Sequence, residues 1–348
     1  MIRFALAVAV VLGFALTAAL GNLFVPLRRV LERHEQPKQQ ARAQERSGLK
    51  QGRQEPEERP ALRPPVWGGL CLAAGTLTAV GMGWAVACIS QPALLGSEGQ
   101  LMARLLTALF GAFAFGAVGL AEDLVRMHSP AGLGLRRGTR LLLEALAAAA
   151  VVLMLHADGC LPQGLGVPGV GYVLLGWPVP VLWAAAMVAL AECTRVAEEA
   201  EGTVCGAAFV AMLALMMLET QLGAFALAVL PAALAGALVA LLLWAFPPAK
   251  LGPGCCGSLF AAGAIGCIPL CMDLTSLVIP LALPFWAEGG MLALQLLHAK
   301  RTGRPLFAAA PLHRWLAKRG MSAEGIFLCM FALSACGYVL ALVLLRWC

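Results

Sequence analysis

The sequence predicts an all-α polytopic membrane protein, and three observations support this fold class. Only 13% of the 348 residues are charged and 60% are hydrophobic, whereas a soluble domain carries about 25% charged residues. The apolar residues come in runs of roughly 17–25, the length that crosses a bilayer core. Lys and Arg gather in every second loop between these runs. We therefore expect one transmembrane domain over residues 1–348.

About ten membrane spans are expected from the positions of the apolar runs. They cover residues 3–25, 66–90, 101–121, 139–157, 177–193, 203–219, 222–246, 257–272, 276–298 and 325–346. The first run lacks the features of a cleaved signal peptide and is predicted to stay as a helix. Segment 158–176 is rich in Gly and Pro, which favours a hairpin or a re-entrant element between two spans.

The distribution of basic residues predicts the orientation of the spans. Loop 26–65 holds ten Lys/Arg, loop 122–140 holds four and loop 299–324 holds six, while the loops at the other ends of the spans hold none. Basic loops mark the cytoplasmic side, so both termini are expected outside. Loop 26–65 is polar enough to be a flexible cytoplasmic loop. Its acidic residues argue against a nucleic-acid partner.

The cysteines are not expected to form disulfides or a zinc site. The chain has 12 of them, mostly inside apolar runs, where a thiol packs as a small hydrophobic group. Cys255 and Cys256 are adjacent and lie in a Gly/Pro-rich loop that also carries Lys250. Such a loop lets backbone amides approach a ligand. A nucleophilic Cys255 would need a lowered pKa, so a structural role is favoured for it.

Acidic side chains recur in the predicted cytoplasmic loops, as a magnesium site requires. Glu122 and Asp123 are paired at the end of the third run, and Glu198 and Glu201 are spaced to share one face of a helical turn. Mg²⁺ takes oxygen ligands together with substrate phosphates. An alternative stays open: the first pair can be a helix-end charge pair with Arg126.

Five motifs in order resemble those of the polyprenyl-phosphate N-acetylhexosamine-1-phosphate transferases, which form glycosyltransferase family 4. The sequence Gly119-Leu-Ala-Glu-Asp-Leu-Val-Arg126 resembles the family's Gly-Phe-x-Asp-Asp-Tyr-x-Lys, and 134–140 resembles Gly-Leu-Ser-x-Lys-x-Lys. Residues 192–203 resemble Asn-x-x-Asn-Leu-Thr-Asp-Gly-Leu-Asp-Gly-Leu, and 248–259 resemble Pro-Ala-Lys-x-Phe-Met-Gly-Asp-x-Gly-Ser-Leu. Residues 310–315 resemble the Ala-Pro-Leu-His-His-His segment of the phospho-N-acetylmuramoyl-pentapeptide transferase (MraY) branch.

The resemblance implies a function and a set of site residues. The family transfers a sugar-1-phosphate from a UDP-sugar to undecaprenyl phosphate with Mg²⁺ and releases UMP. In this register the catalytic positions are Glu122, Asp123, Cys255 and His313, the substrate-binding positions are Arg126, Arg140, Arg195, Lys250 and Arg314, and the metal positions are Asp123, Glu198 and Glu201. The implied partners are undecaprenyl phosphate, a UDP-sugar and membrane lipid, and the implied location is the bacterial cytoplasmic membrane.

The chain departs from the family pattern at several of these positions. Cys255 stands where the family has an aspartate, Arg195 where it has an asparagine, and Arg314 where it has a histidine. A thiol is a poor ligand for Mg²⁺ because soft sulfur prefers zinc or copper(I). The runner-up hypothesis is therefore a catalytically inactive member that binds polyprenyl phosphate, a nucleotide-sugar or a cell-envelope protein. Homodimer formation and the identity of the sugar stay open, and a transporter is least favoured.

Overall fold

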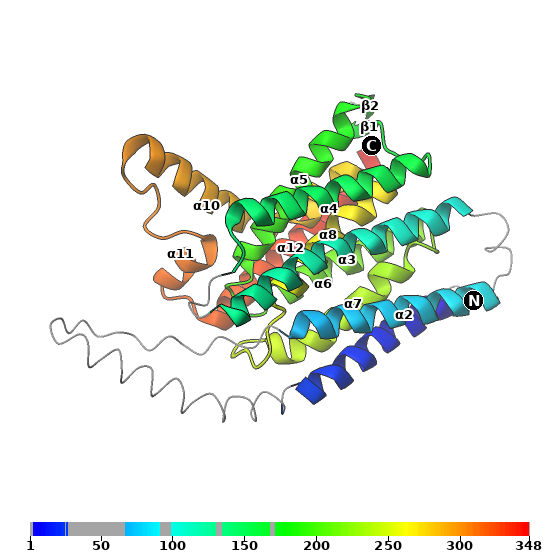
Figure 1. Cartoon of the computed structure of the whole chain (residues 1–348), viewed down its shortest axis with the longest axis horizontal. Coiled ribbons are helices and arrows are strands. Elements are labelled where there is room, and N and C mark those ends of the chain that lie inside the picture. The colour runs from blue at the N-terminus through cyan, green and yellow to red at the C-terminus, as the bar shows by residue number, and fades with distance from the viewer. Residues whose placement is uncertain are drawn as a thin grey trace.

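The structure of the chain, a computed structural model, describes residues 3–24, 26, 67–90, 99–129, 134–167 and 171–347. Helices make up most of this part of the chain, and they lie side by side in a bundle (Figure 1). Nearly all of the predicted basic loop 26–65 lies outside the described residues.

The first helix, Arg3–Phe24, precedes the labelled elements of Figure 1. These are α2 (Gly68–Ser90), α3 (Gly99–His128), α4 (Arg137–Ala157), β1 (Gly164–Val167), β2 (Gly171–Leu174), α5 (Pro178–Ala197), α6 (Thr203–Gln221), α7 (Val229–Ala245), α8 (Gly254–Cys271), the 3₁₀ turn η2 (Thr275–Leu277), α9 (Val278–Leu281), α10 (Leu283–Thr302), α11 (Leu312–Lys318) and α12 (Ala323–Trp347).

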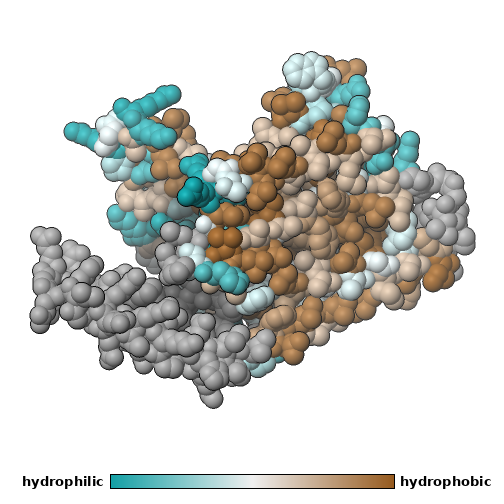
Figure 2. Space-filling model, viewed as in Figure 1, coloured by the Kyte–Doolittle hydropathy of each residue, from teal (hydrophilic) through white to brown (hydrophobic). Residues whose placement is uncertain are grey.

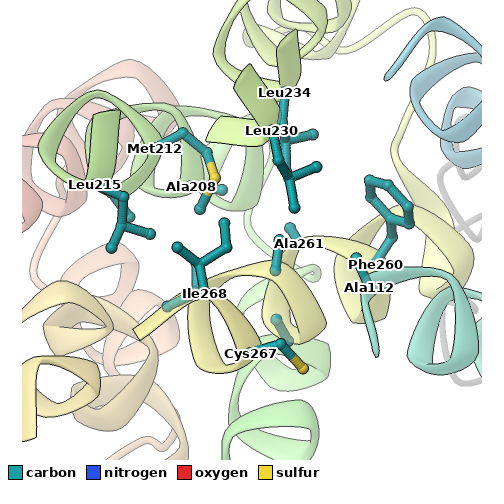
Figure 3. Packing of buried hydrophobic residues seen from close by; sticks show 14 of the residues in the cluster. Ala112, Ala208, Met212, Leu215, Leu230, Leu234, Phe260, Ala261, Cys267 and Ile268 are labelled. Atoms are coloured by element: carbon teal, nitrogen blue, oxygen red, sulfur yellow. The ribbon is translucent and has the colours of Figure 1, made fainter. Parts of the chain in front are cut away.

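Helix α8 forms the centre of the bundle, and every residue of it is buried. Figure 3 shows Ile268 and Ala261 of α8 facing side chains of α6 and α7, with Phe260 beside Ala112 of α3. A Cβ on Gly263 would meet the backbone of Ala112. Membrane helices approach most closely at small residues, because lipid supplies no hydrophobic force to drive them together. The small residues of α8 thus let its neighbours approach closely around it.

The span predicted over 276–298 is a broken helix. Thr275–Leu281 and Leu283–Thr302 meet at a bend of 77°, and Pro284 lies in the first turn of α10. Proline lacks the backbone N–H that would continue the preceding helix, which explains the break here. As a result α10 projects away from the bundle, and α11 follows it at the same end of the molecule (Figure 1).

Strands β1 and β2 pair in an antiparallel arrangement, which is the first of the two elements, a hairpin or a re-entrant element, predicted in 158–176. The hydroxyl of Tyr172 in β2 donates to the carboxylate of Asp273 after α8, with distances of 3.0 Å to both oxygens. In Figure 1 the hairpin and both chain ends lie at the end of the bundle away from α11. Which side of a membrane this end faces stays a prediction.

The predicted fold class, an all-α polytopic membrane protein, is confirmed. Eight helices in the described residues are long and apolar enough to cross a membrane, and the broken helix brings the number to nine. The remaining predicted span, 222–246, is helical only as the 17-residue α7, because Gly223 has a positive φ and residues 222–228 form turns. Figure 2 shows hydrophobic residues covering the middle of the bundle, with hydrophilic residues gathered near α10 and α11.

Candidate active site

A close approach between α3 and the first turn of α8 positions Asp123. A Cβ on Gly119 would overlap the backbone carbonyl of Cys255, so only glycine permits this contact. Asp123 lies one turn later on the same face of α3. Its carboxylate accepts the backbone N–H groups of Cys255 at 3.3 Å and Cys256 at 2.9 Å. Anions are stabilised at a helix N-terminus, and here that place is taken by a side chain of the protein itself.

Arginines from two helices neutralise Glu122, the other member of the acidic pair. Its side chain is buried, and Arg126 donates to it at 3.1 Å. Arg140 reaches the same carboxylate from the first turn of α4, at 3.3 and 3.4 Å. The alternative interpretation of a charge pair between Glu122 and Arg126 is therefore observed. A second arginine, on another helix, takes part in it.

The same Arg140 also holds Glu192 on α5. It donates to the two oxygens of Glu192 at 2.7 and 3.2 Å, and Arg195 donates to one of them at 3.2 Å. We call Glu122, Arg126, Arg140, Glu192 and Arg195 the arginine–carboxylate network. It ties α3, α4 and α5 together, and Asp123 lies beside it against the start of α8.

Glu144 lies next to this network in the interior of the bundle. Its side chain is fully buried, and Nε of Arg140 lies 3.9 Å from its Oε1. Within the described part of the chain, neither carboxylate oxygen has a hydrogen-bond partner. Sequence reasoning missed this residue, although an ionisable residue inside an apolar run is itself a signal, because such residues usually face protein or a watery cavity.

Three glutamates of the turn between α5 and α6 reach three different parts of the protein. Helix α5 ends at Ala197, and Gly202, whose φ is 73°, is the N-cap residue directly before α6. Glu198 points to α8, where the Cys255 thiol donates to it at 3.3 Å. Glu201 accepts the backbone N–H of Ala249 at 3.0 Å. The predicted shared helical face of Glu198 and Glu201 is therefore not formed, because these residues lie in a turn after the helix has ended.

The environment of Glu198 favours its protonated form. Burial, reinforced by the negative charge of Asp123, raises the pKa of Glu198 to about 7. The Cys255 thiol is also buried, and Arg126 lies 3.5 Å from its sulfur. A thiol that donates a hydrogen bond to a carboxylate is protonated. This geometry agrees with the structural role favoured for Cys255.

Glu199, the third glutamate of the turn, belongs to a second group of charged residues around α11. His313 lies between Glu288 of α10, which is 3.0 Å from Nδ1, and Glu199, which is 3.7 Å from Nε2. Burial opposes the charge of His313, but Glu199 and Glu288 outweigh it and raise its pKa to about 9. The contact with His313 and the charge of Arg314 lower the pKa of Glu199 to about 2, against the effect of burial.

Two residues of α10 hold the segment that carries α11. Glu288 accepts the backbone N–H of His313 at 3.0 Å as well as its ring. Seven positions later, Gln295 accepts the N–H of Phe307 at 2.8 Å and donates to its carbonyl at 3.4 Å. We call these residues, Glu288, Gln295, Phe307 and His313, the α10 clamp.

The structure therefore brings the predicted site residues together in two groups. Glu122, Asp123, Arg126, Arg140, Arg195, Glu198 and Cys255 lie in or next to the network, whereas His313 and Arg314 lie with Glu199 and the clamp. Lys250 is exposed in the turn after α7, where its backbone N–H donates to Trp244 at 2.7 Å. Sequence reasoning did not single out Glu199, since a run of acidic residues does not show which member points inward.

Comparison with known proteins gives the family. The model of glycosyl transferase family 4 matches residues 105–273, which include Asp123, Glu198 and Cys255. A phospho-N-acetylmuramoyl-pentapeptide-transferase of Moorella thermoacetica is 30% identical over 75% of this chain and 81% of its own length. The chain belongs to glycosyl transferase family 4. A protein of the same name from Geobacillus kaustophilus is 25% identical over 99% of this chain and 98% of its own length.

The residues present do not fit the Mg²⁺ that family membership implies. Both oxygens of Asp123 are occupied by backbone N–H groups, and Glu122 and Glu192 are held by arginines. Within the described ranges no three Asp, Glu, His or Cys side chains come together as a set of metal ligands. Mg²⁺ requires near-octahedral oxygen ligation. The predicted role of Asp123, Glu198 and Glu201 in metal binding stays a prediction that this arrangement does not support.

Proposed function

We propose that this family 4 member is a phosphoglycosyltransferase of the phospho-N-acetylmuramoyl-pentapeptide-transferase type. It would transfer a sugar-1-phosphate from a UDP-sugar to undecaprenyl phosphate at the cytoplasmic face of the bacterial cytoplasmic membrane. The observation that carries the proposal is the convergence of Asp123 and Arg126 at the N-terminus of α8, with Arg140 beside them on Glu122, inside the region matched by the family model. The similarity to relatives of that name over most of their length supports it.

The reaction requires charge stabilisation more than proton transfer. An oxygen of the lipid phosphate attacks the sugar-bearing phosphorus of the UDP-sugar, a new P–O bond forms, and the P–O bond to UMP breaks. The attacking oxygen is already an anion at neutral pH. Preorganised cations stabilise the charge that spreads over the phosphoryl oxygens in the transition state. The guanidinium groups of the arginine–carboxylate network can supply this charge from α3 and α5.

The α10 clamp positions a further arginine that can bind phosphate. It holds α11, on which Arg314 has a side chain that is 57% exposed and is paired with Glu199. A guanidinium group on a fixed helix can bind a phosphate through two parallel hydrogen bonds. Because Glu199 also contacts His313, both residues of α11 are tied to the α5–α6 turn, which also carries Glu198.

The test is a turnover assay on the full-length protein purified in detergent. It combines undecaprenyl phosphate with UDP-N-acetylmuramoyl-pentapeptide or UDP-N-acetylglucosamine, and it measures UMP release in EDTA and in Mg²⁺. We expect release with one donor, and a loss of about 100-fold or more in Arg126→Gln, as for removal of one charge-stabilising donor. Arg137→Gln is the matched control, since Arg137 is exposed in the first turn of α4; it should keep the wild-type rate.

The runner-up hypothesis is an inactive member that binds polyprenyl phosphate, a nucleotide-sugar or a cell-envelope protein, and the same assay distinguishes it. The observation that favours it is Cys255, whose buried thiol faces Glu198 where the family has an aspartate. Absence of UMP release with both donors and both metal conditions would contradict the proposed transferase. Recovery of release in Cys255→Asp would then show that the aspartate was the missing group.

A further inference from the structure

We propose that the arginine–carboxylate network is a metal-independent binding site for a diphosphate, in which Arg126 and Arg195 bind the ligand and Arg140 positions both. The proposal rests on the proposed function only for the identity of the ligand, the diphosphate of a nucleotide-sugar. In this protein the guanidinium groups would do the work of a divalent cation, which is to offset the charge of the phosphates.

The first argument is the state of the carboxylates. Backbone N–H groups already donate to both oxygens of Asp123, and guanidinium groups already donate to Glu122 and Glu192. The charges of these three carboxylates are therefore offset by donors of the protein itself. A divalent cation placed against them would lie close to arginines of the same sign. An anion placed against the exposed faces of Arg126 and Arg195 would meet groups of opposite sign.

The second argument is the difference in exposure among the arginines. The side chains of Arg126 and Arg195 are 28% and 27% exposed, whereas that of Arg140 is 7% exposed. Two guanidinium groups, one on α3 and one on α5, therefore open toward solvent, and that of Arg140 stays inside. In addition, Nε of Arg195 is a buried donor that has no hydrogen-bond partner among the described residues. Buried donors are nearly always paired, so this one marks a place that a ligand can fill.

The third argument is that a phosphate can bind without leaving a buried charge unpaired. Arg140 donates twice to Glu122 and twice to Glu192. If Arg126 turns from Glu122 to a phosphate, Arg140 still pairs with Glu122. If Arg195 turns from Glu192 to a phosphate, Arg140 still pairs with Glu192. Breaking a buried ion pair is costly because it strands the remaining charge, and the shared partner Arg140 avoids this cost. The planar guanidinium matches a phosphate with two hydrogen bonds.

The experiment measures binding of UDP to the full-length protein in detergent by isothermal titration calorimetry. We expect the same Kd in EDTA and in millimolar Mg²⁺, and no binding of uridine, which lacks phosphate. Arg126→Gln and Arg195→Gln should each weaken binding about tenfold or more, because each removes charge-assisted hydrogen bonds to a phosphate oxygen. Arg137→Gln should bind UDP as the wild type does.

A second pair of variants covers the case in which the glutamine variants do not fold. Arg126→Lys and Arg195→Lys keep the positive charge but lose the planar group that makes two parallel hydrogen bonds to a phosphate. They should bind UDP more weakly than the wild type and more tightly than the glutamine variants. The proposal is overturned if UDP binds only with Mg²⁺, if uridine binds as well as UDP, or if the variants at 126 and 195 match Arg137→Gln.

These outcomes are separable from those of the turnover assay. Metal-free UDP binding without UMP release contradicts the proposed transferase and leaves the diphosphate site standing. UMP release that depends strictly on Mg²⁺, together with Mg²⁺-dependent UDP binding, contradicts the metal-independent site and leaves the transferase standing.

Discussion

The arginine–carboxylate network and the α10 clamp both pair buried carboxylates with cationic side chains, but the cations differ. The network pairs Glu122 and Glu192 with arginines, whereas the clamp pairs Glu288 with His313. Arginine stays charged at every pH at which a protein is folded. Histidine changes its charge, and here its pKa is raised to about 9. The network is therefore expected to withstand alkali, and the clamp to open in alkali.

The two regions also differ in what they hold together. The members of the network sit on α3, α4 and α5, which are fixed by their packing around α8 and by their apolar surfaces. The clamp holds α11, a helix of seven residues that buries His313 and Leu316. A helix this short is not stable by itself, so the polar contacts with α10 decide its position. We infer that the network sets the charge of the site and that the clamp sets its geometry.

The largest effect is expected from removing the cation that the network shares. Arg140→Ala leaves Glu122 and Glu192 buried with fewer partners, and loss of one partner of a buried ion pair costs about 3–5 kcal/mol. The thermal unfolding midpoint in detergent should fall by many degrees. Arg137→Ala, on the same helix but exposed, should leave the midpoint nearly unchanged. Equal midpoints for the two variants would show that the network does not stabilise the bundle.

A pH titration should break the clamp and spare the network. The folded pKa of His313, about 9, lies above its ordinary value of 6.5, so the stability it contributes is complete below pH 6.5 and is lost as the pH rises through 9. The folded pKa of Glu199, about 2, lies below 4.5, so its contribution is complete above pH 4.5 and is lost as the pH falls through 2. The contribution of Glu199 is the smaller one, because solvent screens its partly exposed carboxylate.

The measurement compares the unfolding free energies of the wild type and His313→Gln between pH 6 and pH 10, about the range that the ordinary and raised histidine pKa values span. A tenfold change in proton affinity corresponds to about 1.4 kcal/mol, so the difference between the two proteins should shrink by a few kcal/mol at most as the pH rises. A constant difference would show that His313 is not bound as a cation.

Replacing Cys255 by an acid beside the network should make the unfolding temperature depend on Mg²⁺. We expect no such dependence in the wild type. Cys255→Asp places an acid beside Glu198 and near Asp123, so that three carboxylates face one another. Ligand at 100 times its Kd stabilises the folded state by about 2.7 kcal/mol. The variant should unfold at a higher temperature in Mg²⁺ than in EDTA, whereas the wild type and Cys255→Asn should not. A Mg²⁺ effect on the wild type would argue against the metal-independent site.

The smallest effect is expected at the distal contact of the clamp. Gln295→Ala removes both hydrogen bonds to the backbone of Phe307, at about 1 kcal/mol each. Hydrogen exchange should accelerate in the segment between α10 and α11 and not in α8. Lys300→Ala, an exposed change on the same helix, serves as the control. Unchanged exchange would mean that Glu288 holds the segment alone.

The sequence could predict which residues lie near one another more readily than which partners each of them contacts. Glu122 and Asp123 are adjacent, and they were expected to act as a pair. In the structure Glu122 joins arginines of α3 and α4, while Asp123 caps α8. Consecutive residues of a helix point in directions about 100° apart, since the helix has 3.6 residues per turn, so adjacency in sequence does not imply a shared ligand.

The sequence by itself determined most of the spans and the family, and it limited 158–176 to a hairpin or a re-entrant element, because hydrophobic length and local motifs are properties of short stretches. Only the tertiary structure decided that Glu198 and Glu201 diverge, that Arg140 serves two carboxylates and that Glu144 has no hydrogen bond to any described residue. These features depend on where α5 ends and how closely α3 approaches α8. Both are set by packing between residues far apart in the chain, which no local pattern encodes.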